Sequence, residues 1–396
     1  MAFDFDRTID RVPTSSLKWS YRKRFCGEED ALPLWVADMD FAVAPEIQKA
    51  IQERAGHPIY GYPVRQDGFY TALMGWTSRR YGWNIQREWI CYSPGIVPAI
   101  NLAVLAFSQP GDKIVIQTPV YYPFAAAVLN NGRQLVENPL RLSGERYAMD
   151  LEDLEKKIDS RTKMLILCSP HNPVGRVWTR EELEALADLC AKKDIIVVSD
   201  EIHADIIMPG YRHVPFASLS EDAMNRTLTC LAVSKTFNLA GLCTANVVIS
   251  NRRLRDQFVT MAGNIGLGTS NVFGIVAQEA AYTHGEPWLE ELIHYINNNY
   301  RHLRERIEKA APEIRVFPLE GTYLAWMDCR GLGLEDSALR EFFLHRAKVW
   351  LDHGSMFGNP GKGFMRLNLA CPRALLDQAI ERIEAAVTEL RAGKTG

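Results

Sequence analysis

The 396-residue sequence lacks the long apolar runs and the one-sided charge that mark two large classes of protein. Its longest largely apolar stretches, such as residues 96–107, are far shorter than the ~20 residues that a membrane-spanning helix needs. With 45 Lys and Arg against 48 Asp and Glu, the formal net charge is only −3. Nucleic-acid binders draw most of their affinity from basic residues, so we expect neither a nucleic acid nor a membrane as partner.

The sequence also lacks paired cysteines and the two common nucleotide-binding motifs. Its eight cysteines are scattered, without a C-x-x-C pair or a spacing typical of metal ligands, so we expect reduced, mostly buried thiols and no metal site. Neither G-x-G-x-x-G nor G-x-x-x-x-G-K-[ST] occurs, which argues against nucleotide phosphates as ligands. The first residues show no basic segment followed by an apolar core, which predicts a cytoplasmic protein.

Short apolar runs alternate with helical patterns between about residues 85 and 250. Four runs are apolar on both faces, as buried parallel strands are: residues 113–117, 164–168, 195–199 and 228–233. Thr179 and Glu182 form a capping-box pattern that predicts a helix over residues 183–193. The alternation predicts an α/β fold with a mostly parallel central sheet and helices on both faces.

A different pattern follows residue 285. A long helix runs through Tyr295 and Ile307, two strand-like runs cover residues 314–317 and 323–327, and a closing helix extends from residue 372 to about 391. We interpret residues 46–285 as a large α/β domain, and residues 1–45 with 286–396 as a smaller α+β domain.

Polar residues follow three of the predicted strands, at the edge where parallel sheets bind their ligands. They are Asn172 after the second strand, Asp200 and His203 after the third, and Lys235 after the fourth. Each alone is typical of a loop or turn, but together they predict one site. The turn at Gly95 leads into an apolar helical segment over residues 99–107, and its free backbone N–H groups suit a phosphate.

In their order along the chain, these elements resemble the fold-type I pyridoxal-phosphate (PLP) enzymes of the class I/II aminotransferase superfamily. The matching set is Gly95, Tyr121, Asn172, Asp200, Lys235 and Arg366, and the resemblance spans about residues 30–375. Residues 35–41, 200–203 and 234–238 look like the carbon–sulfur lyase branch of cystathionine β-lyases and maltose-regulon modulators. Typical aspartate aminotransferases carry tyrosine at the position of His203. The resemblance implies a PLP-transferase-like large domain.

The resemblance also implies a role for each residue near the cofactor. Lys235 would form a Schiff base with the cofactor aldehyde and, once released, remove the substrate Cα proton. Asp200 would pair with the pyridinium nitrogen, and Tyr121 would stack on the ring. Asn172 would donate to the ring oxygen, while His203 would lie near that oxygen or support Asp200. Lys235 and Tyr121 are the catalytic candidates.

The remaining implied roles concern the phosphate and the substrate. Backbone at Gly95–Ile96 and the hydroxyl of Ser234 would hold the phosphate. Tyr62 would reach the phosphate of a neighbouring subunit, which implies a homodimer with shared active sites, and nearby Tyr60 is the alternative. Arg366, completed by backbone near Ala37, would grip the α-carboxylate of a small amino-acid substrate through a bidentate fork.

Two positions depart from the family pattern. Many relatives carry an arginine eight residues after the Schiff-base lysine, where this sequence has Cys243. They often carry a serine three residues before that lysine, where this sequence has Ala232. We therefore expect another cation to compensate at the phosphate.

The implied residues serve two reactions that share their first steps. A β-lyase expels a thiolate from Cβ and releases pyruvate and ammonia, whereas an aminotransferase retains the amine. The branch resemblance favours a PLP-dependent cystathionine β-lyase that performs α,β-elimination on L-cystathionine or related cysteine S-conjugates. The alternatives are a PLP-dependent aminotransferase, a regulatory partner of a transcription activator, and a binding module without cofactor.

Overall fold

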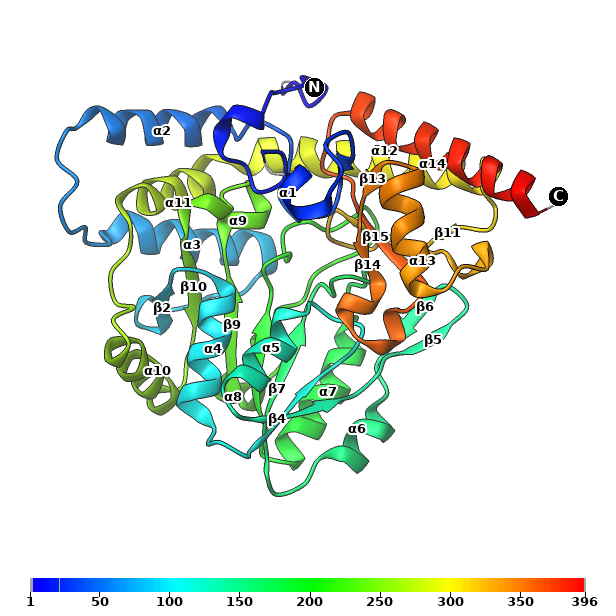
Figure 1. Ribbon diagram of the computed structural model, residues 1–396. Coiled ribbons are helices and arrows are strands. Elements are labelled where there is room, and N and C mark those ends of the chain that lie inside the picture. Colours follow the sequence, from blue (N-terminus) through cyan, green and yellow to red (C-terminus); the bar gives the residue numbers. More distant parts are fainter. Residues whose placement is uncertain (1–2, 21, 395–396) are drawn as a thin grey trace.

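A seven-stranded sheet is the framework of the protein in the computed structural model, which describes residues 3–20 and 22–394 (Figure 1). Its strands lie in the order β2, β10, β9, β8, β7, β3, β4. Their bounds are β2 (Ile90–Ser93), β3 (Lys113–Ile116), β4 (Gln134–Glu137), β7 (Thr162–Cys168), β8 (Ile196–Asp200), β9 (Thr227–Leu231) and β10 (Ala245–Val248). Only β10 runs antiparallel to its neighbours, so the mostly parallel sheet is confirmed. The four predicted strands are β3, β7, β8 and β9.

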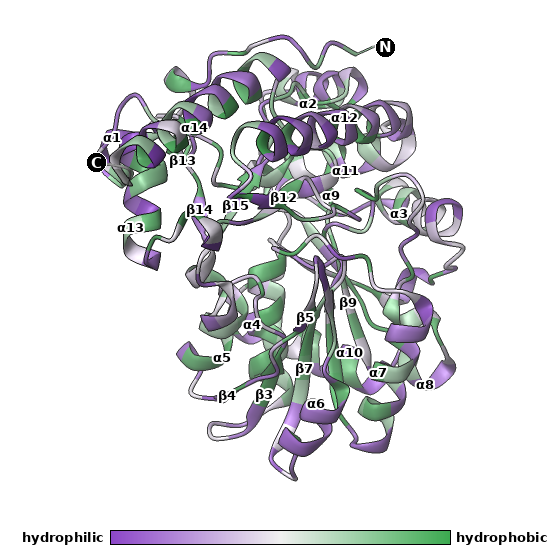
Figure 2. Ribbon diagram, turned by 90° about the vertical axis from the view of Figure 1, so that its right-hand side faces the viewer, coloured by the Kyte–Doolittle hydropathy of each residue, from purple (hydrophilic) through white to green (hydrophobic). Residues whose placement is uncertain are grey.

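Helices cover both faces of this sheet, as the alternating pattern predicts. One face packs against α4 (Ile96–Phe107), α5 (Pro123–Asn130) and α10 (Arg252–Asn264), and the other against α6 (Leu151–Lys157), α7 (Arg180–Lys192) and α8 (Glu221–Arg226). Figure 2 shows α4 and α5 on one side of the strands and α7 and α8 on the other. Strands covered on both sides must be apolar on both faces, which explains their sequence.

The capping box at the start of α7 is present. Thr179 Oγ1 accepts a hydrogen bond from the Glu182 backbone N–H, and the Glu182 carboxylate accepts one from the Thr179 N–H at 2.9 Å. These two bonds satisfy donors that a helix start leaves free, so α7 begins at Arg180.

A second, antiparallel sheet lies beside the large one and contains β11 (Arg315–Val316), β12 (Leu324–Asp328), β15 (Phe364–Asn368) and β14 (Asp352–His353) in that order. The long helix α12 (Glu286–Ala310) and the closing helix α14 (Arg373–Lys394) pack against each other and share one core with this sheet. The predicted long helix, two strands and closing helix are therefore confirmed. The division of the chain at residues 46 and 285 stays a prediction.

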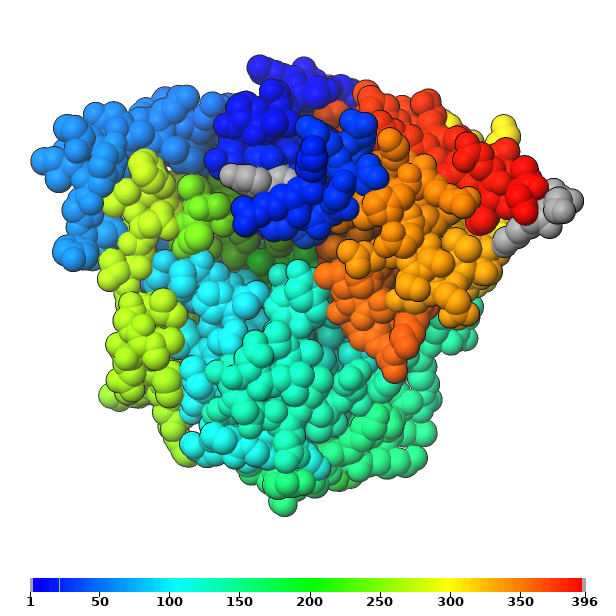
Figure 3. Space-filling model, viewed as in Figure 1, coloured from blue at the N-terminus to red at the C-terminus, as the bar shows by residue number. Residues whose placement is uncertain are grey.

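The remaining elements connect these layers. They are α1 (Arg22–Cys26), β1 (Leu32–Pro33), α2 (Pro45–Gly56), α3 (Asp67–Tyr81), β5 (Arg141–Ser143), β6 (Arg146–Ala148), α9 (Val233–Thr236), α11 (Val272–His284), α13 (Asp336–Glu341) and β13 (Val349–Trp350). β1 pairs in parallel with β13, which ties the N-terminal segment to the C-terminal part. Figure 3 shows this N-terminal segment crossing above a hollow in the molecular surface.

Three observations concern the cysteines, membrane-spanning helices and metal sites. All eight cysteines are free and six are buried, in agreement with the prediction for the thiols. Within the described ranges, we find no helix with the length and apolarity to cross a bilayer. The same residues contain no group of three or more His, Cys, Asp or Glu side chains arranged to hold a metal ion.

Candidate active site

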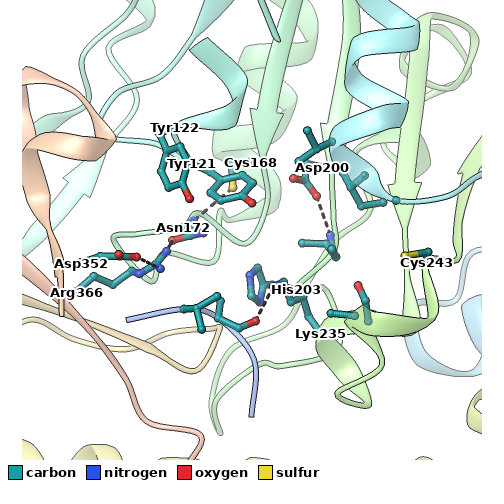
Figure 4. A pocket seen from close by; sticks show the side chains of 18 of the residues that line it. Tyr121, Tyr122, Cys168, Asn172, Asp200, His203, Lys235, Cys243, Asp352 and Arg366 are labelled. Atoms are coloured by element: carbon teal, nitrogen blue, oxygen red, sulfur yellow. Dashed lines mark hydrogen bonds and ion pairs between the residues drawn. The ribbon is translucent and has the colours of Figure 1, made fainter. Parts of the chain in front are cut away.

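The predicted site residues converge on one cavity of about 190 Å³ at the carboxyl ends of β7 and β8 (Figure 4). Those that line it are Ala37, Gly95, Ile96, Tyr121, Asn172, Asp200, His203, Ser234, Lys235 and Arg366. The exception is Tyr62, which is 98% exposed on the segment between α2 and α3. The convergence follows from the topology, because parallel strands end at the same edge of their sheet.

Lys235 lies on α9, directly after the interior strand β9. Its Nζ donates a hydrogen bond to the Ala37 carbonyl at 2.6 Å, and the Tyr323 hydroxyl donates to the same oxygen at 2.8 Å. Burial, assisted by the nearby Arg366 guanidinium, lowers the pKa of Lys235 to about 8. A larger fraction of the amine is therefore neutral near pH 7 than for a lysine in water, as a nucleophile or base requires.

Asp200 ends β8 and is flanked in register by Cys168 of β7 and Cys230 of β9. The only hydrogen bond to its side chain in the described part of the chain comes from the Ile202 N–H at 3.1 Å. Burial raises the pKa of this carboxyl to about 7. A cationic N–H group bound in the cavity would restore its ionised form, so Asp200 is prepared for a protonated ring nitrogen.

Arg366 projects from β15, with only 3% of its side chain exposed. It donates to the Asn172 side-chain oxygen at 2.9 Å and to the Trp35 carbonyl at 3.0 Å. It also forms an ion pair with Asp352, its register partner on β14. Burial raises the pKa of Asp352 although Arg366 opposes the shift. Arg366 Nε has no hydrogen-bond partner, which leaves a buried donor for a ligand.

His203 and Tyr121 lie between these charged groups (Figure 4). Burial lowers the pKa of His203 well below its ordinary value, so the ring is neutral, and its Nδ1 is buried without a partner. Its ring packs edge-on against Tyr323, with centroids 5.6 Å apart. Burial raises the pKa of Tyr121 to about 12, so its hydroxyl stays protonated.

The opposite end of the cavity suits a phosphate. Gly95–Ile96 begins α4, Ser234 lies opposite, and the buried Thr244 hydroxyl has no hydrogen-bond partner. Cys243 is exposed at the rim, with φ of 45°. Among the described residues that line the cavity, Lys235 and Arg366 are the only cations at neutral pH, so none of these supplies the compensating cation expected there.

This set of groups fits PLP. The cavity offers an amine for the aldehyde, a buried carboxylate for the ring nitrogen, an amide and an unpartnered imidazole for the ring oxygen, and a helix start for the phosphate.

The cavity residues that sequence reasoning missed include Tyr122, Cys168, Thr244 and Asp352. Tyr122 follows a predicted site residue, and Cys168 ends a predicted strand, so position alone could have indicated both. No motif indicates Asp352, because only the pairing of β14 with β15 brings it to Arg366.

The segment Trp35–Asp40 contacts both Arg366 and Lys235. The Trp35 carbonyl accepts from Arg366 and the Ala37 carbonyl from Lys235. The Asp40 carboxylate accepts from three residues of the N-terminal segment: Lys18 at 2.6 Å, Arg11 at 2.6 Å and Trp19 at 2.8 Å. The chain start therefore anchors the wall of the cavity.

The family model "Aminotransferase class I and II" matches residues 29–383. The chain belongs to this aminotransferase family. Within the family it is 43% identical to the cystathionine β-lyase PatB of Bacillus subtilis (strain 168), over 97% of this chain and 100% of the relative. It is 33% identical to the protein MalY of Escherichia coli (strain K12), over 98% and 100%.

Solved structures of the family agree with this assignment. Cystalysin from Treponema denticola, which contains PLP, has a TM-score of 0.96 at 38% identity and covers 98% of this chain and 100% of its own. The PLP-bound C–S lyase from Staphylococcus hominis has a TM-score of 0.91 at 34% identity, over 97% and 98%. The predicted fold and the resemblance to the carbon–sulfur lyase branch are confirmed.

Proposed function

We propose that the protein is a PLP-dependent carbon–sulfur β-lyase acting on L-cystathionine or related S-conjugates of L-cysteine. The proposal rests on a full-length relative at 43% identity that is a cystathionine β-lyase, together with an amine, a buried carboxylate and an arginine in one cavity of this chain. The net reaction converts the S-conjugate and one water into a thiol, pyruvate and ammonium.

Each residue has a physical task in this reaction. Bound PLP supplies an electron sink for the negative charge that develops at the substrate Cα. Arg366 binds the α-carboxylate, and its contacts to Asn172 and the Trp35 carbonyl fix the plane of the guanidinium. Lys235 Nζ accepts the Cα proton, which its pKa of about 8 permits near neutral pH.

The other groups hold the cofactor. Asp200 would hold the ring nitrogen, Tyr121 would stack on the ring, and Asn172 and His203 would contact the ring oxygen. Gly95–Ile96 and Ser234 would hold the phosphate.

We also propose that the protein acts as a homodimer in which Tyr62 completes the phosphate site of the second copy. Two facts support this arrangement. Ile59, Tyr62 and Val64 form an exposed apolar segment, which soluble proteins usually cover. The described cavity also lacks a third cation for the phosphate. The cytoplasmic location stays a prediction.

The test of the proposed function is an assay of pyruvate from L-cystathionine, with and without an added 2-oxo acid. We expect pyruvate without any acceptor. The competing function is amino transfer, which the family description and a 43% identical PLP-bound putative aminotransferase from Clostridium difficile 630 favour. Amino transfer that strictly requires the 2-oxo acid would refute the lyase and support this alternative.

A further inference from the structure

The cavity has two chemically different ends. Gly95–Ile96, Ser234 and Thr244 line one end, and Trp35, Tyr122, Asp352 and Arg366 line the other. Figure 4 shows Asp352 and Arg366 at the end opposite Cys243, with Tyr121, Asn172 and His203 between. Under the proposed function, the cofactor occupies the first end and the middle, and Arg366 takes the α-carboxylate. The part of the substrate beyond sulfur would therefore contact the wall of the cavity formed by Trp35, Tyr122 and Asp352.

The charge of this wall is negative once substrate is bound. Asp352, with 6% of its side chain exposed, already neutralises Arg366 through a direct ion pair. The α-carboxylate of the substrate then brings a second negative charge to the same guanidinium. Among the described lining residues, the only other cation at neutral pH is Lys235, which bonds to Ala37 instead. One positive charge thus faces two negative charges at the substrate end.

The surroundings strengthen this effect. Trp35 stacks on Trp350 with ring centroids 4.4 Å apart. An adjoining cavity that shares Trp35 and Asp352 is lined by Phe25 and Met356, and also by Arg340 and His353. Because the Asp352 side chain is only 6% exposed, the local dielectric constant is lower than in water, so a charge on the substrate interacts with Asp352 more strongly than it would in solution.

We propose that Asp352 determines substrate specificity by selecting S-conjugates whose distal group is neutral or positively charged and by disfavouring a second carboxylate at that position. This inference rests on the proposed β-lyase function. L-Cystathionine meets the requirement because its distal part carries an ammonium group beside its carboxylate. Aspartate and glutamate, which have a lone distal carboxylate, do not.

The experiment compares three cysteine S-conjugates of similar length in the holoenzyme: S-ethyl-, S-(2-aminoethyl)- and S-carboxymethyl-L-cysteine. The measured quantity is the ratio of kcat/KM for the aminoethyl and carboxymethyl substrates, from pyruvate release. We expect Asp352→Asn to lower this ratio about tenfold, which corresponds to ~1.4 kcal/mol. Any change in the grip of Arg366 on the shared α-carboxylate cancels in the ratio.

Two control variants isolate the charge. Glu341→Gln removes one negative charge from an exposed position outside the cavity and leaves the ratio unchanged. Asp352→Glu keeps the charge and keeps the preference for the aminoethyl substrate. A ratio that Asp352→Asn does not change overturns the proposal.

The design separates this inference from the proposed function. Pyruvate from S-ethyl-L-cysteine reports β-lyase activity independently of distal charge. If no conjugate yields pyruvate, the lyase is refuted. The dissociation constants of the three conjugates, measured by calorimetry for wild type and Asp352→Asn, then decide the specificity: the same tenfold change supports it, and equal ratios refute it.

Discussion

Replacing Lys18 with methionine should destabilise the protein, because Lys18 is a fully buried cation. Its side chain is 0% exposed, and Nζ lies 2.6 Å from one Asp40 oxygen and 3.4 Å from the Asp38 carbonyl. Removing one partner of a buried ion pair typically costs about 3–5 kcal/mol. Asp40 keeps Arg11 and Trp19 as partners, so we expect the lower end, about 3 kcal/mol at pH 7.

The pH dependence of this loss has a definite sign. Burial alone would raise the pKa of Asp40, but Lys18 and Arg11 outweigh burial and hold it below its ordinary value. A lowered folded-state pKa contributes stability that is fully present above the unfolded value of about 3.9 and disappears as the pH falls through the folded value. The difference between wild type and Lys18→Met should therefore be full at pH 7 and should narrow below about pH 4.

Urea unfolding followed by circular dichroism measures the free energy of unfolding at pH 7 and again below about pH 4. Lys49→Met is the matched control, because Lys49 pairs with Glu53 at a distance of 3.8 Å on the exposed surface of α2. Such exposed pairs contribute less than about 0.5 kcal/mol. The reasoning is refuted if Lys18→Met costs no more than this control, or if its cost does not depend on pH.

Three further predictions concern the cavity. Asp200→Asn should stabilise the cofactor-free protein by about 2–4 kcal/mol at pH 8 but not at pH 4. The reason is that burial raises the pKa of Asp200 to about 7, so at pH 8 the wild-type folded state must hold a buried ionised carboxylate. Thermal unfolding at the two pH values measures the gain in stability, and equal gains at both would contradict the prediction. Arg366→Lys should lower kcat/KM for S-ethyl-L-cysteine about tenfold to a hundredfold, since an ammonium cannot form the two-pronged contact; steady-state kinetics measures the loss, and wild-type values would refute the assigned role. Tyr62→Phe should weaken PLP retention during dialysis, measured by visible absorbance, without changing the sedimentation coefficient; unchanged retention would remove Tyr62 from the phosphate site.

The large sheet can be predicted from the sequence because strands that are buried on both faces consist mainly of apolar residues. Strands β7, β8 and β9 are buried at nearly every position, and a polar residue lies at or shortly after the carboxyl end of each one. Since such strands end at one edge, Asn172, Asp200 and Lys235 could be placed together before any coordinates.

Contacts between segments far apart in the chain cannot be predicted in this way. Asp352 meets Arg366 through antiparallel register, and Lys18 meets Asp40 through the path of an irregular segment. Neither depends on a periodic pattern, so spacing along the chain does not reveal them. Tyr62 lies on the outer surface, and its proposed contact with a phosphate requires a second chain, which one sequence does not place.

The contacts of the segment Trp35–Asp40 also determine when during synthesis the cavity can be completed. Its Val36 and Asp38 carbonyls accept hydrogen bonds from Asn368, at 2.8 and 2.6 Å, and its Asp40 N–H donates to the Ala370 carbonyl at 2.9 Å. Val36 and Asp38 therefore meet Asn368 only after the 332 and 330 residues that separate them along the chain have been synthesised. The large sheet can form while synthesis continues. The cavity wall that Trp35–Asp40 provides takes its final position only after residues 364–370 have left the ribosome, so a chain that stops before β15 has no finished cavity.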